Sequence, residues 1–357
     1  MPAKGATGVL TMMMPYLLMV ALQFGLAGTY TLAMRALEHG MSRYVFVVYR
    51  NAIAALALAP FALFLEREIR PKMTPSVFLQ IAFLGLLEPV IGLHFTYLGM
   101  TYTNASFGSA ITNAVPSITF MMAVILRLEP LKLKELPGMA KVAGTGFTFA
   151  GTLVMTLYKG PVIHLPWSKV TSQAWPNDDA TDKHWIVGAT FMFVACVAWS
   201  AFYVLQSITV IAYPAEISLA SLICLAGAIE GAVMALVGEH RHGAWDIGWD
   251  SRLVAPLYTG IVGSGITYYL QLLMSKSRGP VFVTAFNPLN MIVLAVLGSL
   301  TQSERLHLGS VIGSVVVVVG LYTVLWGKNK DYSEAIAMRE EGREAPKPSA
   351  AAGDQAQ

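Results

Sequence analysis

The chain has 357 residues, of which 55% are hydrophobic and 13% are charged, and its formal net charge is +3. Soluble domains carry about 25% charged residues, so this composition excludes an ordinary water-soluble globular protein. The small net charge also gives no reason to expect a nucleic-acid partner.

Apolar windows recur along nearly the whole sequence, and each is about as long as the roughly 20 residues that cross a bilayer. They are continuous, without the alternation of a β-barrel strand, so we expect helices. The first window is too long for the core of a signal peptide. The sequence therefore predicts an all-α integral membrane protein with ten transmembrane helices, at about 12–34, 44–65, 75–99, 105–126, 138–158, 185–207, 216–238, 253–274, 280–300 and 308–327.

The loops and the two ends suggest how these helices are oriented. Lys and Arg are more frequent on the side of the N-terminal segment 1–11 than on the other, so both termini are expected in the cytoplasm. This assignment counts Arg50 among the residues of the outer side. The longest loop, 159–184, would then be non-cytoplasmic and separates five helices from five. The tail 328–357 has few large apolar residues and is expected to be disordered.

An internal repeat links the two halves, 12–158 and 185–327. A shift of 172 residues aligns Thr112 with Thr284 and Pro116 with Pro288, and it also pairs Tyr97-Leu98 with Tyr269-Leu270. Five helices are an odd number, so the second half must enter the membrane from the opposite side. The pattern predicts an inverted repeat, in which two halves rock about a central site.

Polar residues interrupt the aligned windows. Thr112, Asn113 and Pro116 share one helix face, and Thr284, Asn287 and Pro288 repeat the pattern in the second half. One interpretation is that the four Thr and Asn side chains bind a substrate in a central cavity while Pro116 and Pro288 act in gating. The alternative is that these groups only form hydrogen bonds between helices.

Other polar residues within the apolar windows are second-choice substrate contacts. Glu88 and His94 fall in the third window, where a charge at the bilayer centre costs roughly 2.5–3.5 kcal/mol. Glu88 could bind an ammonium group, relay a proton or be a protonated structural acid, and the two residues lie about 120° apart on the helix. Gln23, Tyr203 and Gln271 belong to polar and aromatic stripes that are typical of packing, although a buried amide needs partners.

The sequence gives no indication of a metal, a cofactor or an enzyme. The two cysteines, Cys196 and Cys224, fall in separate apolar windows, which excludes a disulfide framework or a thiol metal site. No P-loop is found in the sequence, which argues against transport driven by ATP.

Several segments together resemble the drug/metabolite transporter superfamily with two EamA-type halves, and more narrowly the plant nodulin-like, WALLS ARE THIN-related branch, also called UMAMIT transporters. The resemblance covers roughly residues 12–330 and is carried by "LQFGLAGTYTL", "GLLEPVIG", "LGMTYTNASFGSAITNAVPSITF", "TLYKGP" and "GPVFVTAFNPLNMIVLAVLGS". It implies facilitated, often bidirectional movement of amino acids, typically export. Some relatives move auxin, and relatives occur in the plasma membrane or the vacuolar membrane.

We therefore predict a facilitative amino-acid exporter that works by alternating access, with the plasma membrane as the first choice of location and the vacuolar membrane as the alternative. Its expected partners are a small-molecule substrate and membrane lipids, and a homo-oligomer is left open. A carrier for auxin or another organic acid is the first rival, and the lack of a mid-span Arg or Lys counts against it. A membrane receptor or scaffold is a remote second rival.

Overall fold

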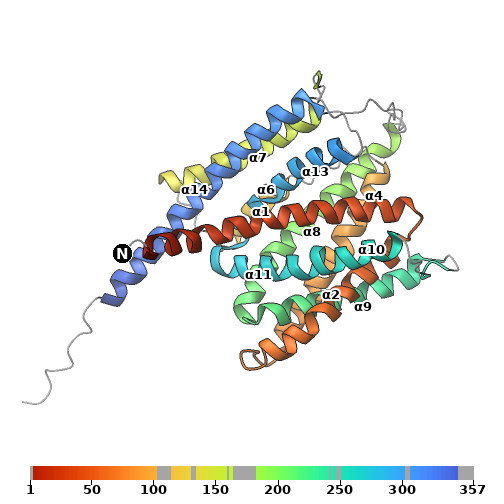
Figure 1. Ribbon diagram of the computed structural model, residues 1–357, viewed down its shortest axis with the longest axis horizontal. Helices are drawn as coiled ribbons and strands as arrows, with labels where there is room; N and C mark the ends of the chain where they lie inside the picture. Colours follow the sequence, from red (N-terminus) through yellow and green to blue (C-terminus); the bar gives the residue numbers. More distant parts are fainter. Residues whose placement is uncertain are drawn as a thin grey trace, which may run out of the picture.

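The computed structural model describes residues 3–102, 114–129, 134–158, 161–163, 182–240, 243–246, 251–301 and 306–344. The described chain is a bundle of helices (Figure 1). Its extended elements within these ranges are the two-residue strands β1 (Val162–Ile163) and β2 (Leu306–His307), which pair antiparallel. The helical fold class is confirmed, with this short pairing as an addition.

The helices follow the expected apolar windows. In the first half the helical elements are α1 (Ala3–Glu38), α2 (Arg43–Leu65), α3 (Pro75–Gly85), the π-helix η1 (Leu86–Gly92), α4 (Leu93–Tyr102), α6 (Val115–Ile125) and α7 (Leu136–Leu157). In the second half they are α8 (Asp182–Ala212), α9 (Glu216–Gly238), α10 (Ser251–Tyr258), the π-helix η2 (Thr259–Ile266), α11 (Thr267–Arg278), α12 (Pro280–Ala285), α13 (Asn287–Thr301) and α14 (Leu308–Glu344).

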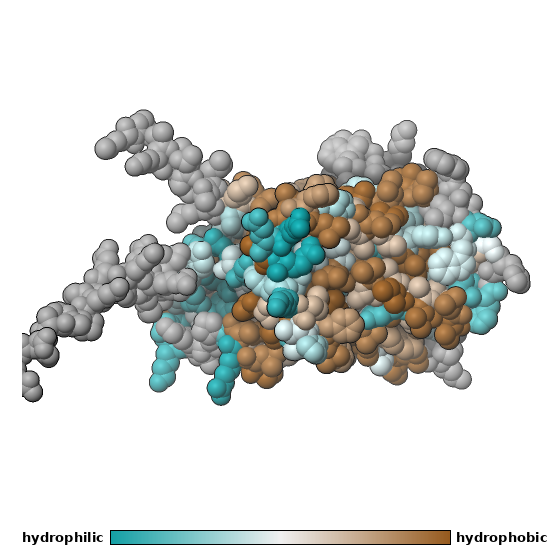
Figure 2. Space-filling model, turned by 90° about the horizontal axis from the view of Figure 1, so that it is seen from below, coloured by the Kyte–Doolittle hydropathy of each residue, from teal (hydrophilic) through white to brown (hydrophobic). Residues whose placement is uncertain are grey.

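Within the described residues, seven helical stretches are long and apolar enough to cross a membrane. They are Met13–Leu37, Arg43–Leu65, Pro75–Gly99, Ile186–Ala212, Glu216–Gly238, Leu253–Arg278 and Val311–Ser333. Val115–Ile125 and Pro280–Leu294 are apolar but shorter. Hydrophobic residues cover much of the face in Figure 2, as expected for a surface in contact with lipid. The protein is thus a multi-pass membrane protein, and the count of ten helices stays a prediction.

Helices from the two halves pack against each other in a regular pattern. In Figure 1, α7 and α14 run side by side along one flank of the bundle, and α2 and α9 lie at the opposite flank. Several contacts come in matching pairs: α6 packs on α8 as α13 packs on α1, α3 on α9 as α10 on α2, and η1 on α9 as η2 on α2. Each pair is converted into the other when the halves are exchanged.

Small residues let α7 and α14 approach closely. A Cβ atom on Gly144 would lie 2.7 Å from the carbonyl oxygen of Gly320, and one on Gly151 would lie 2.8 Å from the amide of Val317. Such contacts between backbones are the usual way in which helices associate in a membrane. The pairing of these two helices therefore depends on glycine at these positions.

The last helix extends further than we expected. α14 continues to Glu344, so the prediction of a disordered tail from residue 328 is wrong for residues 328–344. Ala, Glu, Lys, Met and Arg are frequent there and favour helix, and they extend a helix that the membrane span has already nucleated. The side chain of Asp331 also pairs with Lys141 of α7, at 2.6 Å. Residues 345–357 lie outside the described residues.

Candidate functional site

A buried arginine in α2 is the centre of the candidate site. Arg50 is 5% exposed and lies inside the span Arg43–Leu65. Our assignment of Arg50 to the outer side is therefore wrong, and so is the expectation that no cation lies within a span. A positive charge inside a membrane span is costly and normally faces a partner or a water-filled path. The partners of Arg50 thus define the site.

Two π-helices supply these partners. In η1 the amide of Leu93 donates to the carbonyl of Glu88 five residues earlier, which is the π-helical spacing. Pro89 has no N–H group and therefore cannot complete the ordinary helical ladder at this point. The 172-residue shift between the halves sets Leu86–Gly92 against residues 258–264, nearly the range of η2. Single π-helical turns are frequent at functional sites.

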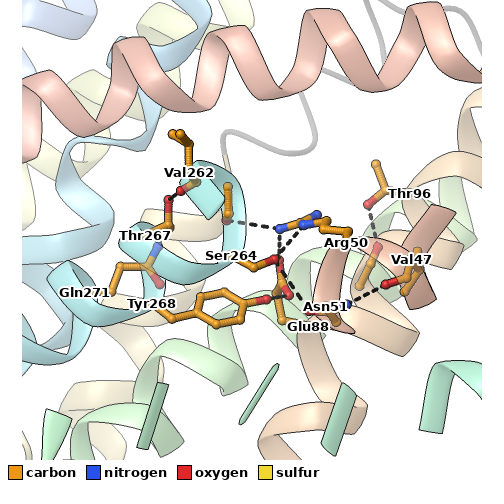
Figure 3. Close-up of polar contacts among 12 residues, drawn as sticks. Val47, Arg50, Asn51, Glu88, Thr96, Val262, Ser264, Thr267, Tyr268 and Gln271 are labelled. Atoms are coloured by element: carbon orange, nitrogen blue, oxygen red, sulfur yellow. Dashed lines mark hydrogen bonds and ion pairs between the residues drawn. The ribbon is translucent and has the colours of Figure 1, made fainter. Parts of the chain in front are cut away.

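Arg50 contacts both π-helices (Figure 3). Its Nε atom donates to the hydroxyl of Ser264 at 2.7 Å, and Nη2 donates to the carbonyl of Gly263 at 3.2 Å. Nη2 also lies 3.6 Å from Oε1 of Glu88, an ion pair that is too long for a hydrogen bond. The other carboxylate oxygen of Glu88 accepts a hydrogen bond from the hydroxyl of Tyr268. Arg50 and Glu88 of the first half are therefore both tied to the second half.

Close packing of η2 on α2 makes these contacts possible. A Cβ atom on Gly260 would lie 2.7 Å from the carbonyl oxygen of Arg50 and 3.0 Å from Ile53. Only glycine leaves room for the η2 backbone at this distance. Asn51, the next residue of α2, is fully buried; it donates to the carbonyl of Val47 at 2.9 Å and accepts from Ser264 at 3.5 Å. Gly260 thus allows the polar groups of η2 to reach those of α2.

Three of the residues predicted from the sequence meet at one hydroxyl group. The side chain of Gln271 donates to the hydroxyl of Tyr203 at 3.5 Å, and the side chain of Asn287 also hydrogen bonds to it. Tyr203 and Gln271 are buried, and Oε1 of Gln271 has no partner among the described residues. The ring of Phe202 packs against the ring of Tyr268, with ring centroids 5.4 Å apart and the planes tilted by 49°. These contacts connect the neighbourhood of Tyr203 with the group that binds Glu88.

The other predicted residues lie in different surroundings. His94 contacts the carbonyl of Val90 through Nδ1 at 2.7 Å and packs on Tyr44, and its buried Nε2 atom has no hydrogen-bond partner among the described residues. Gln23 is 1% exposed, and its Oε1 atom has no partner among the described residues. Thr284 is fully buried, with its hydroxyl bonded to the carbonyls of Pro280 and Val281. Its hydroxyl is therefore already engaged within its own helix.

The two predicted gating prolines both stand near helix starts. Pro116 is buried in the first turn of α6, and Pro288 is buried in the first turn of α13. α12 ends at Ala285 and the chain turns at Phe286, where the helical ladder cannot continue because Pro288 has no N–H to donate to the carbonyl of Thr284. Thr112 and Asn113 lie outside the described residues.

Sequence reasoning missed Arg50, Ser264 and Tyr268 as site residues. Arg50 could have been found, because the sequence places it seven residues after Arg43, well inside an apolar window. Ser264 carries no such signal, since serine is common at helix contacts in membranes. The described residues contain no group of three His, Cys, Asp or Glu side chains that could hold a metal ion.

Comparison with known proteins gives a consistent result. The model of the EamA-like transporter family matches residues 9–157 and 186–326. One WAT1-related protein of Arabidopsis thaliana is 53% identical over 332 residues, covering 92% of this chain and 86% of the relative. A second WAT1-related protein of the same plant is 48% identical and covers 91% and 86% of the two chains.

A solved crystal structure has a similar fold. It aligns with a TM-score of 0.64 at 15% sequence identity, covering 89% of this chain and 97% of the other. At this level of identity the likeness concerns the fold alone.

Proposed function

The chain belongs to the EamA-like transporter family and to its plant WAT1-related branch, and from this premise we propose that it is a facilitative, bidirectional carrier that exports amino acids by alternating access. The observation that carries the proposal is the buried polar network of Arg50, Glu88, Ser264 and Tyr268. It joins the two halves of the chain near the middle of the spans Pro75–Gly99 and Leu253–Arg278. A carrier needs a site that both halves share.

Ten transmembrane helices in two inverted repeats, 12–158 and 185–327, are the architecture that we propose for this carrier. The paired packing of α6 on α8 with α13 on α1, and of η1 on α9 with η2 on α2, supports it. So does the match of the family model to two separate stretches of the chain. In this architecture the segments around Pro116 and Pro288 are equivalent. α6, which contains Pro116, packs on α12, which ends three residues before Pro288, and Phe120, Ala123 and Val281 form one buried cluster.

Substrate contacts in our proposal come from both halves. The first half contributes Arg50 and Glu88, and the second half contributes Tyr203. Gln271 and Asn287, also of the second half, extend the network toward α13. Thr112, Asn113, Thr284, Gln23 and His94 are kept as further candidates from the sequence. An amino acid suits such a site because the amides and the opposed charges can satisfy both of its ionic groups.

The auxin or organic-acid carrier is the second candidate, and Arg50 is the observation that favours it. A guanidinium binds a carboxylate well. However, Glu88 already balances the charge of Arg50, so an anion that displaced Glu88 would leave a buried carboxylate with no cation. A ligand with both charges avoids this cost, and we therefore rank amino acids first.

For the location we propose the plasma membrane, with both termini in the cytoplasm and the vacuolar membrane as the alternative. The distribution of Lys and Arg in the loops supports the orientation.

Counterflow in proteoliposomes tests the proposed function. The purified full chain is reconstituted into vesicles that are loaded with unlabelled glutamine or unlabelled auxin, and uptake of the same labelled compound is followed. We expect exchange of glutamine without a proton gradient. Exchange of auxin alone would replace the amino-acid proposal by its rival, and exchange only under an imposed proton gradient would refute the facilitative mode.

A further inference from the structure

We infer that Arg50 and Glu88 determine specificity by binding the two charges of a zwitterion: Arg50 takes the carboxylate of the ligand, and Glu88 takes its ammonium group. This inference rests on the proposed function, since it names the groups that recognise an amino acid. In the structure the two side chains are 7% and 13% exposed and face each other across 3.6 Å (Figure 3). Each of the two charged groups therefore has the other as its charge partner in this arrangement.

The hydrogen bonds of Arg50 leave capacity for a ligand. A guanidinium has five N–H donors in a fixed fork. Among the described residues, Arg50 uses one donor for Ser264 and one for Gly263, and the contact with Glu88 is longer than a hydrogen bond. A carboxylate can form two parallel hydrogen bonds with such a fork. Arg50 is thus anchored by η2 and still able to bind a carboxylate.

Glu88 has matching capacity on its side. An ionised carboxylate offers about four acceptor positions. One oxygen of Glu88 accepts from Tyr268, and the other faces Arg50 without a hydrogen bond between them. An ammonium group has donors that can occupy the positions left on Glu88. The hydrogen bond from Tyr268 keeps the carboxylate in place while its partner changes.

Charge balance selects the class of ligand. The pair is neutral as a whole, and a buried charge without a partner is strongly destabilising. A zwitterion exchanges one ion pair for two and leaves no charge unmatched. An anion strands Glu88, and a cation strands Arg50. The pair should therefore discriminate against molecules that carry only one of the two charges.

The test compares three ligands that differ only in these charges. They are glutamine, glutaramate, which lacks the amine, and 4-aminobutanamide, which lacks the carboxylate. Binding is measured as ligand-dependent thermal stabilisation of the purified full chain in detergent, so that variants without transport can still be titrated. For the unchanged protein we expect each analogue to bind at least tenfold more weakly than glutamine.

Substitutions at the two sites should shift the preference in opposite directions. Glu88→Gln removes the group for the ammonium, so the ratio of glutaramate to glutamine affinity should rise at least tenfold. Arg50→Gln should raise the ratio for 4-aminobutanamide in the same way. Lys276→Gln is the matched control, because it removes the charge of a lysine that is 41% exposed and pairs with Glu216. This substitution should leave both affinity ratios unchanged.

The outcomes separate the two proposals. If glutamine binds and both variants keep the ligand ratios of the unchanged protein, the pair is only structural and the inference is overturned, while the amino-acid carrier stands. If indole acetate stabilises the protein and glutamine does not, the proposed function fails. Should Arg50→Gln not fold, Arg50→Lys keeps the charge and loses the fork; it must weaken glutamine binding while sparing 4-aminobutanamide, and an equal loss for both ligands contradicts the inference.

Discussion

Two buried ionic clusters of this protein differ in geometry and in position. In one, which we call the end cluster, Glu129 accepts from Lys141 at 3.0 Å and from Lys328 at 2.5 Å, and Lys141 also pairs with Asp331. It ties the loop after α6 to α7 and to α14. In the other, the central network, Arg50 and Glu88 are 3.6 Å apart and lie within spans.

The difference indicates different roles. In the end cluster both oxygens of Glu129 are hydrogen bonded to lysines, and Lys141 is 1% exposed. A ligand could bind to Glu129 or to its lysines only by breaking one of these short hydrogen bonds. In the central network the charges balance without a hydrogen bond between them, and polar groups of both halves surround them. The end cluster should therefore hold helices together, and the central network should bind and release a ligand.

The largest effect is expected from Glu129→Gln, which leaves Lys141 and Lys328 without their shared carboxylate. Loss of one partner of a buried ion pair costs about 3–5 kcal/mol. The apparent melting temperature of the purified protein should fall strongly, whereas counterflow per folded molecule should be retained. Lys276→Gln, at a largely exposed pair, should cost less than about 1 kcal/mol. A stable Glu129→Gln protein that has lost transport would reverse the two roles.

Gly260→Ala should come next, because it pushes η2 away from α2. The added Cβ atom would meet the carbonyl oxygen of Arg50 at 2.7 Å, and overpacking of this kind typically costs about 1–3 kcal/mol. We expect a moderate drop in melting temperature together with a loss of counterflow. Gly146→Ala is the control, since a Cβ atom there meets no atom within 4 Å. Normal transport by Gly260→Ala would show that the spacing of η2 and α2 is not needed.

Ser264→Ala should affect ligand binding more than stability. It removes the acceptor 2.7 Å from Nε of Arg50, and a hydrogen bond to a charged group contributes about 1.5–3 kcal/mol. Arg50 would then be held less firmly, and we expect the affinity for glutamine to fall about tenfold in the thermal titration. An unchanged affinity would mean that Arg50 needs no anchor in η2.

The smallest effect is expected from Asn287→Ala, at the edge of the network. Asn287 and Gln271 share the hydroxyl of Tyr203, so one of the two amides remains after the substitution. Transport should fall severalfold with little loss of folded protein, as judged by initial counterflow rates normalised to monodisperse protein. Unchanged uptake and efflux would remove Asn287 from the site.

The candidate site was predicted only in part. The repeated pattern predicts Asn287, and the polar and aromatic stripes predict Tyr203 and Gln271; the structure brings these three together. The hydroxyl of Thr284 and Nδ1 of His94 have their hydrogen bonds within their own helices, whereas Nε2 of His94 is buried with no partner among the described residues. A polar side chain in an apolar window requires a partner, but a helix carbonyl four residues away can be that partner as well as a ligand can.

The sequence by itself determined the helical membrane fold and the positions of its helices. It could do so because the length of apolar runs, the spacing of prolines and the charge of loops are local properties of the chain. Tertiary structure decided which polar groups meet. Arg50 and Ser264 are 214 residues apart, and the sequence contains no sign of their contact. The contact exists because Gly260 lets η2 approach α2. Glu88 of η1 joins it from a third element, 3.6 Å from Arg50. Helix packing of this kind depends on the shapes of two surfaces at once, which no single stretch of sequence contains.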